Sequence, residues 1–277
     1  MSDRITLSSE KPSFLLPRRD PMIIAMLDSC RPVELASEMK NSICDGADAI
    51  CVEIGKLEKE FHSGEYYRQI FSYAEDCPVY VTNYRDNFNS GLTDDALAAG
   101  LLEALDCGAT LCDVMGDMYS PDPLELTKNP SAVSKQKELI CEIHRRGGEV
   151  IMSSHVKRHL CQNDVIDFAL SQEARGVDIV KLVTVADTME QLMENLNASL
   201  LLQKRLSIPF IFVANGQYGK IQRNIGYMFG SFALLCVYRY RTPRIFSQPL
   251  IKSMKSVLQN VDWKPDRILK EAIGGLQ

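Results

Sequence analysis

The feature that most constrains the fold is an eightfold alternation of short apolar runs with longer amphipathic segments. The short runs are rich in Val, Ile and Phe and are almost continuously apolar, which is typical of parallel strands covered on both faces. We expect strands at Met22–Leu27, Ala49–Ile54, Val79–Tyr84, Thr110–Met115, Glu149–Ser154, Asp178–Val183, Phe210–Asn215 and Phe232–Val237.

Longer amphipathic segments lie between the apolar runs, and several of them have helical start or stop signals. Thr93 precedes two aspartates and is a good N-cap, while Gly147, Gly148 and Gly176 follow predicted helix ends. We expect helices at Pro32–Cys44, Glu65–Asp76, Thr93–Cys107, Ser131–Arg146, Gln162–Arg175, Thr188–Arg205, Ile221–Phe229 and Pro249–Gln259.

Eight strand–helix units without a break in composition predict an α/β protein with a single (β/α)8 barrel. The 277 residues suit one such domain over positions 1–277, with positions 1–20 as an N-terminal extension or lead-in. A doubly wound open sheet is the alternative architecture.

The composition narrows the classes of partner and compartment. The formal net charge is −5, and the basic residues are scattered, so we expect no binding to nucleic acid. Nine cysteines lie mostly in apolar runs, without a CxxC pair or zinc-ligand spacing, which favours reduced thiols and a cytoplasmic protein. We find no signal-peptide pattern and no stretch of ~18 apolar residues, so we expect no membrane span.

Two residues at neighbouring strand ends suggest chemistry. In a barrel of this type, active-site residues gather at the carboxyl ends of the strands. Lys181 lies in the apolar run 178–183, and a lysine in low-dielectric surroundings can become the neutral amine that attacks a ketone. His155 ends the preceding strand, and its imidazole is suited to proton transfer. The structural alternatives are a lysine that reaches water from a strand end and a histidine that makes a structural hydrogen bond.

A third candidate, Arg223, follows the glycine-containing loop 215–220. An arginine just inside a helix can hold a carboxylate with two hydrogen bonds, although a solvated helix arginine is the alternative interpretation.

We expect no metal and no cofactor, because the iminium that forms when a lysine attacks a ketone supplies the electron sink itself. The segment Gly216–Gly219 is too short to be a phosphate-binding loop.

From about Met22 to about Ala272, the sequence resembles the type I 3-dehydroquinate dehydratase family. The segments that carry the resemblance are Gly46–Asp48, Val150–His155, Asp178–Lys181, Gly219–Arg223 and Phe229–Ser231, with 25 residues between His155 and Lys181. The resemblance implies a Schiff-base barrel enzyme of the shikimate pathway, a hydro-lyase that converts 3-dehydroquinate to 3-dehydroshikimate. It implies that Lys181 forms the imine, that His155 is the general base and acid, and that Arg223 grips the substrate carboxylate.

Further substrate-binding residues follow from the same resemblance. Arg85 matches the arginine at the end of the third strand, although the stretch here is one residue longer than in the family. Gln248 matches the glutamine of the lid after the eighth strand, where Arg244 is an additional cation.

The second strand departs from the family pattern of a glutamate followed two positions later by an arginine. Either Cys51 and Glu53 or Glu53 and Gly55 occupy these places. Period-two alternation turns Glu53 inward in both registers, and the arginine is absent in both.

Three functions therefore remain open. The first is dehydration of 3-dehydroquinate through an imine. The second is a Schiff-base lyase or aldolase that acts on a different polyhydroxy keto acid, and the third is a catalytically altered barrel that binds a metabolite. The small-molecule keto acid is the expected partner in each case, and a homodimer is possible because the family often dimerises.

Overall fold

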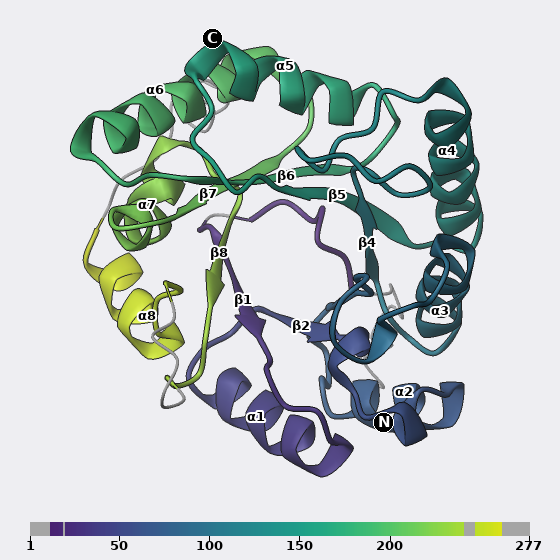
Figure 1. Cartoon of the computed structure of the whole chain (residues 1–277). Coiled ribbons are helices and arrows are strands. Elements are labelled where there is room, and N and C mark those ends of the chain that lie inside the picture. The colour runs from purple at the N-terminus through teal and green to yellow at the C-terminus, as the bar shows by residue number, and fades with distance from the viewer. Residues whose placement is uncertain (1–11, 19, 241–246, 262–277) are drawn as a thin grey trace, which may run out of the picture.

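The structure is a computed structural model that describes residues 12–18, 20–240 and 247–261. Strands and helices alternate along these residues, and the helices form a ring outside the strands (Figure 1). The strands are β1 (Met22–Met26), β2 (Ala49–Glu53), β3 (Val79–Thr82), β4 (Leu111–Met115), β5 (Glu149–His155), β6 (Ile179–Val185), β7 (Phe210–Asn215) and β8 (Ala233–Cys236). The helices are α1 (Pro32–Cys44), α2 (Gly64–Ser72), α3 (Asp94–Asp106), α4 (Pro130–Arg145), α5 (Gln162–Glu173), α6 (Met189–Arg205), α7 (Gly219–Ile225) and α8 (Ile251–Asn260).

The strands form one parallel sheet in the order β7-β6-β5-β4-β3-β2-β1-β8. The last strand pairs with the first, and Phe232 N donates a hydrogen bond of 2.8 Å to Phe210 O, which brings the β8 side of the sheet to β7. This arrangement confirms the predicted (β/α)8 barrel, so the open-sheet alternative is wrong. All eight predicted strands are present, and the helix predicted at Ile221–Phe229 is α7 followed by a 3₁₀ turn at Gly226–Phe229.

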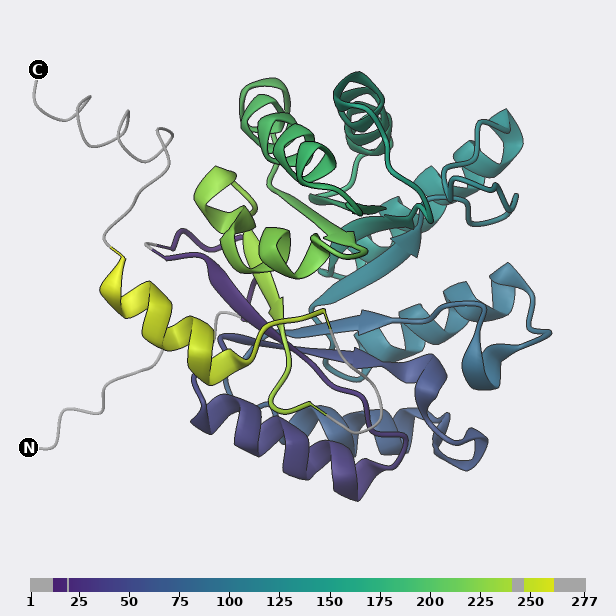
Figure 2. The same ribbon diagram turned by 60° about the vertical axis from the view of Figure 1, so that its left-hand side comes forward.

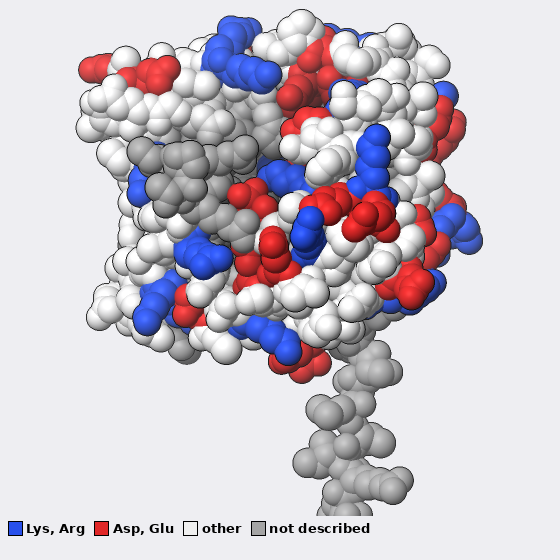
Figure 3. Space-filling model, turned by 60° about the horizontal axis from the view of Figure 1, so that its bottom comes forward, with Lys and Arg blue, Asp and Glu red and all other residues white. Residues whose placement is uncertain are grey.

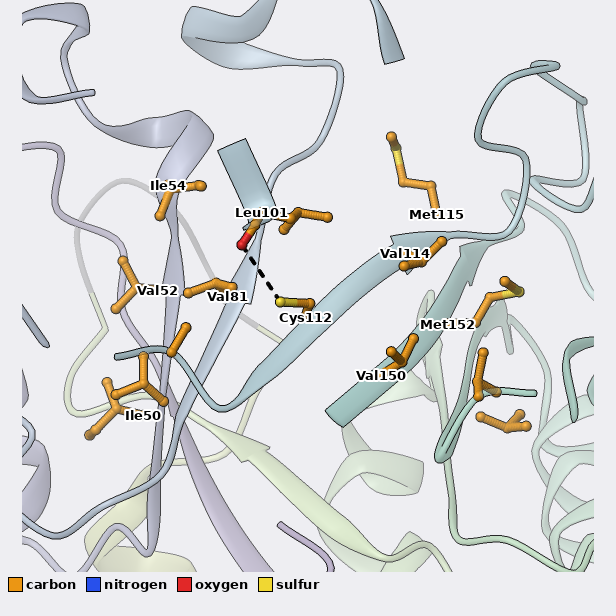
Figure 4. Close-up of a cluster of buried hydrophobic side chains, with 14 of the residues drawn as sticks. Ile50, Val52, Ile54, Val81, Leu101, Cys112, Val114, Met115, Val150 and Met152 are labelled. Atoms are coloured by element: carbon orange, nitrogen blue, oxygen red, sulfur yellow. Dashed lines mark hydrogen bonds between the residues drawn. The ribbon is translucent and has the colours of Figure 1, made fainter. Parts of the chain in front are cut away.

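Two apolar cores follow from the alternation along each strand. The outer core lies between strands and helices, and Figure 4 shows Val52, Val81 and Val114 from three neighbouring strands within it. The inner core fills the barrel with residues of the opposite parity: Met22, Ile24, Ala49, Cys51, Tyr80, Leu111, Ile151, Ile179, Val183, Ile211, Val213, Ala233 and Leu235. The interior is therefore a packed core that leaves polar chemistry to the carboxyl ends of the strands.

Residues 12–18 close the opposite, amino-terminal end of the barrel. Phe14 is fully buried in the inner core and meets the Tyr80 ring edge-on at 6.4 Å. The Phe14 N–H and the Ser13 hydroxyl both donate to the carboxylate of Glu149, the first residue of β5. This plug belongs to the segment predicted as a lead-in, and it leaves the other end of the barrel as the mouth.

Acidic and basic side chains are interspersed on the face shown in Figure 3. All nine cysteines are free thiols.

Within the described ranges, no helix is both long and apolar enough to cross a bilayer. Figure 2 shows the same barrel from the side, with the ring of helices around it and α8 next to α1.

Candidate active site

Lys181 lies in the middle of β6, and its side chain points into the barrel. The residue is 3% exposed, so its side chain does not reach solvent, contrary to the alternative interpretation of a lysine that extends to water. The Nζ atom donates to the hydroxyl oxygens of Tyr80 at 2.9 Å and Tyr84 at 3.1 Å, and it forms an ion pair with Asp113 Oδ2 at 3.3 Å. The amine is thus held from three sides.

Asp113, from β4, is the centre of this network. Its Oδ2 accepts hydrogen bonds from Tyr80 and, at 2.7 Å, from Tyr84, while its Oδ1 accepts one from Ser153 at 2.5 Å. Burial, followed by the nearby Asp113 charge, raises the pKa values of both phenols well above the ordinary value of 10. Both phenols therefore stay protonated and donate.

The alternation along the strands brings these groups together. Tyr80 has the inner parity of β3, whereas Val79 and Val81 belong to the outer core. Tyr84 lies two residues beyond the end of β3, and its hydroxyl reaches the same lysine. On the other side, Ser153 of β5 is the register partner of Lys181. Four consecutive strands thus each supply a polar group to one layer of the barrel.

His155 is the last residue of β5, and its side chain is 34% exposed. Its Nδ1 lies 3.1 Å from Glu125 Oε2, and its backbone N–H donates to the same oxygen at 2.7 Å. Burial raises the pKa of Glu125, but the hydrogen bonds and charge of His155 outweigh burial, so the net pKa is lowered. A carboxylate at Nδ1 favours the tautomer that leaves Nε2 as the basic nitrogen.

Tyr84 links the two predicted catalytic residues. Its hydroxyl contacts Lys181, and its ring meets the His155 ring edge-on at 5.3 Å between centroids. The structure therefore brings Lys181 and His155 to one mouth with a phenol between them.

Sequence reasoning missed Glu125, which lies in the irregular loop 116–129 and has a left-handed φ of 53°. The one available signal was Gly116 directly after β4, where a Cβ would lie 2.4 Å from Glu125 O and 2.5 Å from Ser154 Oγ. Arg175 holds the base of this loop: its guanidinium donates to Gly116 O at 2.6 Å, Thr127 O at 2.6 Å and Gln136 Oε1 at 2.5 Å.

Arg223 lies in α7 and is 8% exposed, so the interpretation as a solvated helix arginine is wrong. Its Nε donates to Ala214 O at 2.9 Å, and one terminal nitrogen donates to Asn215 Oδ1 at 3.0 Å, near the end of β7. Both acceptors are neutral, and burial lowers the pKa of Arg223 to about 10. A buried cation that is bonded to neutral acceptors is suited to bind an anion.

Glu53, at the end of β2, pairs with a lysine of the following 3₁₀ turn. Its Oε2 lies 2.9 Å from Lys56 Nζ, which also lies 3.2 Å from Asp28 Oδ1. Burial raises the pKa of Glu53, and Lys56 offsets this rise only in part. A Cβ on Gly55 would lie 2.4 Å from Asn89 Nδ2, so a side chain there would have to displace the amide of the buried Asn89. Lys56 thus supplies a cation beside Glu53.

Arg85 does not lie beside Lys181. Its guanidinium bonds both oxygens of Asp94 at 2.8 Å, and it bonds Asp117 through Oδ1 at 2.7 Å and the carbonyl oxygen at 2.9 Å. Tyr84 takes the inward place, so the next residue turns away, and Arg85 joins the end of β3 to the start of α3 and the loop after β4.

Gln248 precedes the short parallel bridge between Leu250 and Val237, and its carbonyl oxygen accepts a hydrogen bond of 3.1 Å from Tyr240. Arg244 lies outside the described residues. Among the described residues, no group of three or more His, Cys, Asp and Glu side chains is arranged to hold a metal ion.

The sequence comparisons with known proteins all point to one family. A sequence model described as type I 3-dehydroquinase matches residues 96–262. A 3-dehydroquinate dehydratase of Alkaliphilus oremlandii is 35% identical over 97 residues, which is 34% of this chain and 38% of that protein. One from Aromatoleum aromaticum is 27% identical over 97 residues, or 35% and 36% of the two chains. The chain thus matches little more than a third of the length of these curated relatives.

Solved structures extend the likeness in fold to most of the chain. The 3-dehydroquinate dehydratase of Geobacillus kaustophilus superposes with a TM-score of 0.73 at 16% identity, covering 87% of this chain and 91% of that one. The type I enzyme of Clostridium difficile with covalently modified comenic acid gives 0.74 at 18% identity, covering 87% and 92%. Lys181, His155, Arg223 and Gln248 lie inside the matched segment 96–262, whereas Glu53 and Arg85 lie before it.

Proposed function

Since the chain belongs to the type I 3-dehydroquinase family, we propose that it is a hydro-lyase that converts 3-dehydroquinate to 3-dehydroshikimate through an imine at Lys181. The observation that carries this proposal is the buried Lys181 amine, which shares one barrel mouth with His155 through their common contact with Tyr84. The covalently modified ligand of the Clostridium difficile enzyme agrees with covalent chemistry in this fold.

The imine makes the elimination possible. Lys181 replaces the ketone oxygen of the substrate, and the iminium acidifies the adjacent carbon. His155 removes a proton from that carbon through Nε2 while Glu125 holds Nδ1. The same imidazolium then protonates the departing hydroxyl, which leaves as water, and hydrolysis of the imine returns Lys181 and the enone product.

The charged groups around the mouth fit a polyhydroxy acid. Arg223 is a buried guanidinium with neutral partners, and we assign it to the substrate carboxylate. Glu53 and Lys56 form an ion pair, and we assign its carboxylate and its ammonium group to hydroxyl groups of the substrate. Gln248 is assigned to the side of the substrate that faces the lid. A cytoplasmic location, a small-molecule keto acid as partner and the absence of nucleic-acid binding stay predictions from the sequence.

One observation favours a second candidate, the same chemistry on a different polyhydroxy keto acid. The part of the mouth formed by β2 and β3 lies before the matched segment. There Lys56 is the cation beside Glu53 in place of the expected arginine, and Arg85, predicted to bind substrate, is bonded to Asp94 and Asp117. Lys56 contacts substrate hydroxyls in our assignment, so its presence changes which ring is bound and leaves the Lys181 amine in place.

The test is the appearance of enone absorbance when the purified protein is mixed with 3-dehydroquinate. We expect Lys181→Ala to abolish turnover and His155→Ala to slow it by about 10²- to 10⁴-fold, the usual contribution of a general base. Arg223→Met should mainly raise KM, and Lys204→Ala, an exposed residue, is the control.

A wild-type protein that is inert towards 3-dehydroquinate but forms an adduct with another keto acid would favour the second candidate. Full activity in Lys181→Ala would remove the imine from the mechanism.

A further inference from the structure

The Asp113 network has one shallow and one deep phenol, and this difference suggests a function beyond holding the lysine. Tyr84 is partly exposed and touches His155 at the mouth, whereas Tyr80 is fully buried and packs against Phe14 at the closed end. Both hydroxyls contact Lys181 Nζ and Asp113 Oδ2. Only the Tyr84 side of the network therefore faces an incoming ketone.

Imine formation at a buried ammonium requires proton transfers that solvent does not easily provide. The reaction joins an ammonium and a ketone to give an iminium and one water molecule. Two of the three ammonium protons must therefore move from Nζ to the former ketone oxygen. Lys181 is 3% exposed and Asp113 is fully shielded, so these protons need a route within the protein.

We propose that Asp113 and Tyr84 form the proton shuttle of imine formation at Lys181, separate from the later work of His155 on the substrate carbon. This inference rests on the proposed imine function and assigns to it a second acid–base centre.

The proton transfers of this shuttle balance without a proton from solvent. Asp113 Oδ2, 3.3 Å from Nζ, takes the first proton, and the neutral amine attacks the ketone carbon. The Tyr84 hydroxyl, 2.7 Å from the same carboxylate oxygen, passes a proton to the new alkoxide and is reprotonated by Asp113. The second proton leaves nitrogen by the same route as the hydroxyl departs as water. Asp113 ends as a carboxylate beside the iminium, so the net charge of the site is unchanged.

The contacts distinguish this centre from His155. His155 meets the ring edge of Tyr84 and is tied to Glu125, whereas the groups hydrogen-bonded to Nζ are the two phenols and Asp113. Ser153 holds the other oxygen of Asp113, which leaves Oδ2 turned toward the lysine. The two steps therefore use different acid–base groups on either side of one phenol.

The experiment is rapid-quench trapping with borohydride, with the Lys181 adduct of 3-dehydroquinate quantified by mass spectrometry. We expect imine formation to slow by about 10²-fold or more in Asp113→Asn and by at least about 10-fold in Tyr84→Phe, the range for loss of acid–base assistance. Tyr227→Phe is the control, because its buried hydroxyl has no hydrogen-bond partner among the described residues, and it should stay within about threefold of wild type. Tyr80→Phe deletes the same group on the closed side of the network and should slow imine formation less than Tyr84→Phe does. His155→Ala should keep the imine rate while it slows dehydration.

Three results would overturn the shuttle: an imine rate within about threefold of wild type in Tyr84→Phe, an equal loss in Tyr80→Phe, or a loss in His155→Ala as large as that in Asp113→Asn. If Asp113→Asn does not fold, the comparison of Tyr84→Phe with Tyr80→Phe decides alone.

Failure of the proposed function is visible separately, as a wild-type protein that gives no adduct with 3-dehydroquinate. In that case, reductive methylation with formaldehyde and cyanoborohydride tests the shuttle on its own, with surface lysines as internal reference. The shuttle predicts slower modification of Lys181 in Tyr84→Phe, whereas a role in charge balance alone predicts no change or a faster reaction.

Discussion

Arg175 offers the sharpest test of how the site is held, because it touches neither Lys181 nor His155. Its buried guanidinium donates three short hydrogen bonds to Gly116 O, Thr127 O and Gln136 Oε1. These contacts close the base of the loop that carries Glu125, the partner of His155. Arg175→Met keeps much of the apolar stem and removes all three bonds.

The size of the effect can be worked from these contacts. Each hydrogen bond from a charged donor contributes about 1.5 kcal/mol at the low end, so three contribute about 4.5 kcal/mol. Arg175 is 7% exposed, so its charge is poorly solvated, and replacing it by an apolar side chain returns about 1–2 kcal/mol. We expect a net loss of about 3 kcal/mol in the free energy of unfolding.

Urea denaturation of Arg175→Met beside Arg205→Met, an exposed arginine at the end of α6, measures this loss. Activity should fall in Arg175→Met even where the protein is folded, since Glu125 loses its fixed place. A loss below about 1 kcal/mol, or one equal to that of Arg205→Met, would refute the account of this loop.

Three further predictions concern other parts of the molecule. Glu125 has a folded-state pKa below its ordinary 4.5, so its ionisation stabilises the fold above about pH 4.5, and this stability is lost as the pH falls through the lowered pKa. In Glu125→Gln, the melting temperature should therefore fall less steeply with decreasing pH than in the wild type. An unchanged pH dependence would contradict the pairing with His155. Gly55→Ala should cost about 1–3 kcal/mol in chemical denaturation, because its Cβ would lie 2.4 Å from Asn89 Nδ2, and a neutral effect would show that there is room for a side chain. Phe14→Ala should cost about 3–5 kcal/mol, far more than Leu16→Ala at an exposed position, and equal effects would mean that Phe14 does not plug the barrel.

The fold could be predicted from the sequence because its signals are local and repeated. Each strand is a short apolar run, several helices have a start or stop signal of their own, and Thr93 caps α3 as expected by accepting a hydrogen bond from Ala96 N. Eight such units have few ways to bury both faces of a parallel sheet. The burial of Lys181 was one of two interpretations left open by the sequence, because a lysine in an apolar strand can also extend to water, and the 3% exposure of the residue decides between them.

The composition of the site was harder to predict because it depends on single-residue register and on irregular backbone. Tyr84 and Arg85 are neighbours, and one step along the strand decides which of them meets Lys181. Asp113 was seen only as part of a strand, because its partners lie 33 residues before it and 68 residues after it. Glu125 reaches His155 from a loop without periodicity, so no spacing rule indicates the contact.

The most direct test of the central claim is the mass of the protein after incubation with 3-dehydroquinate and borohydride, followed by peptide mapping. An imine at Lys181 predicts one reduced adduct per chain, confined to the peptide that contains Lys181 and absent from Lys181→Ala. A protein that turns over 3-dehydroquinate without any adduct, or with an adduct on another lysine, would contradict the account.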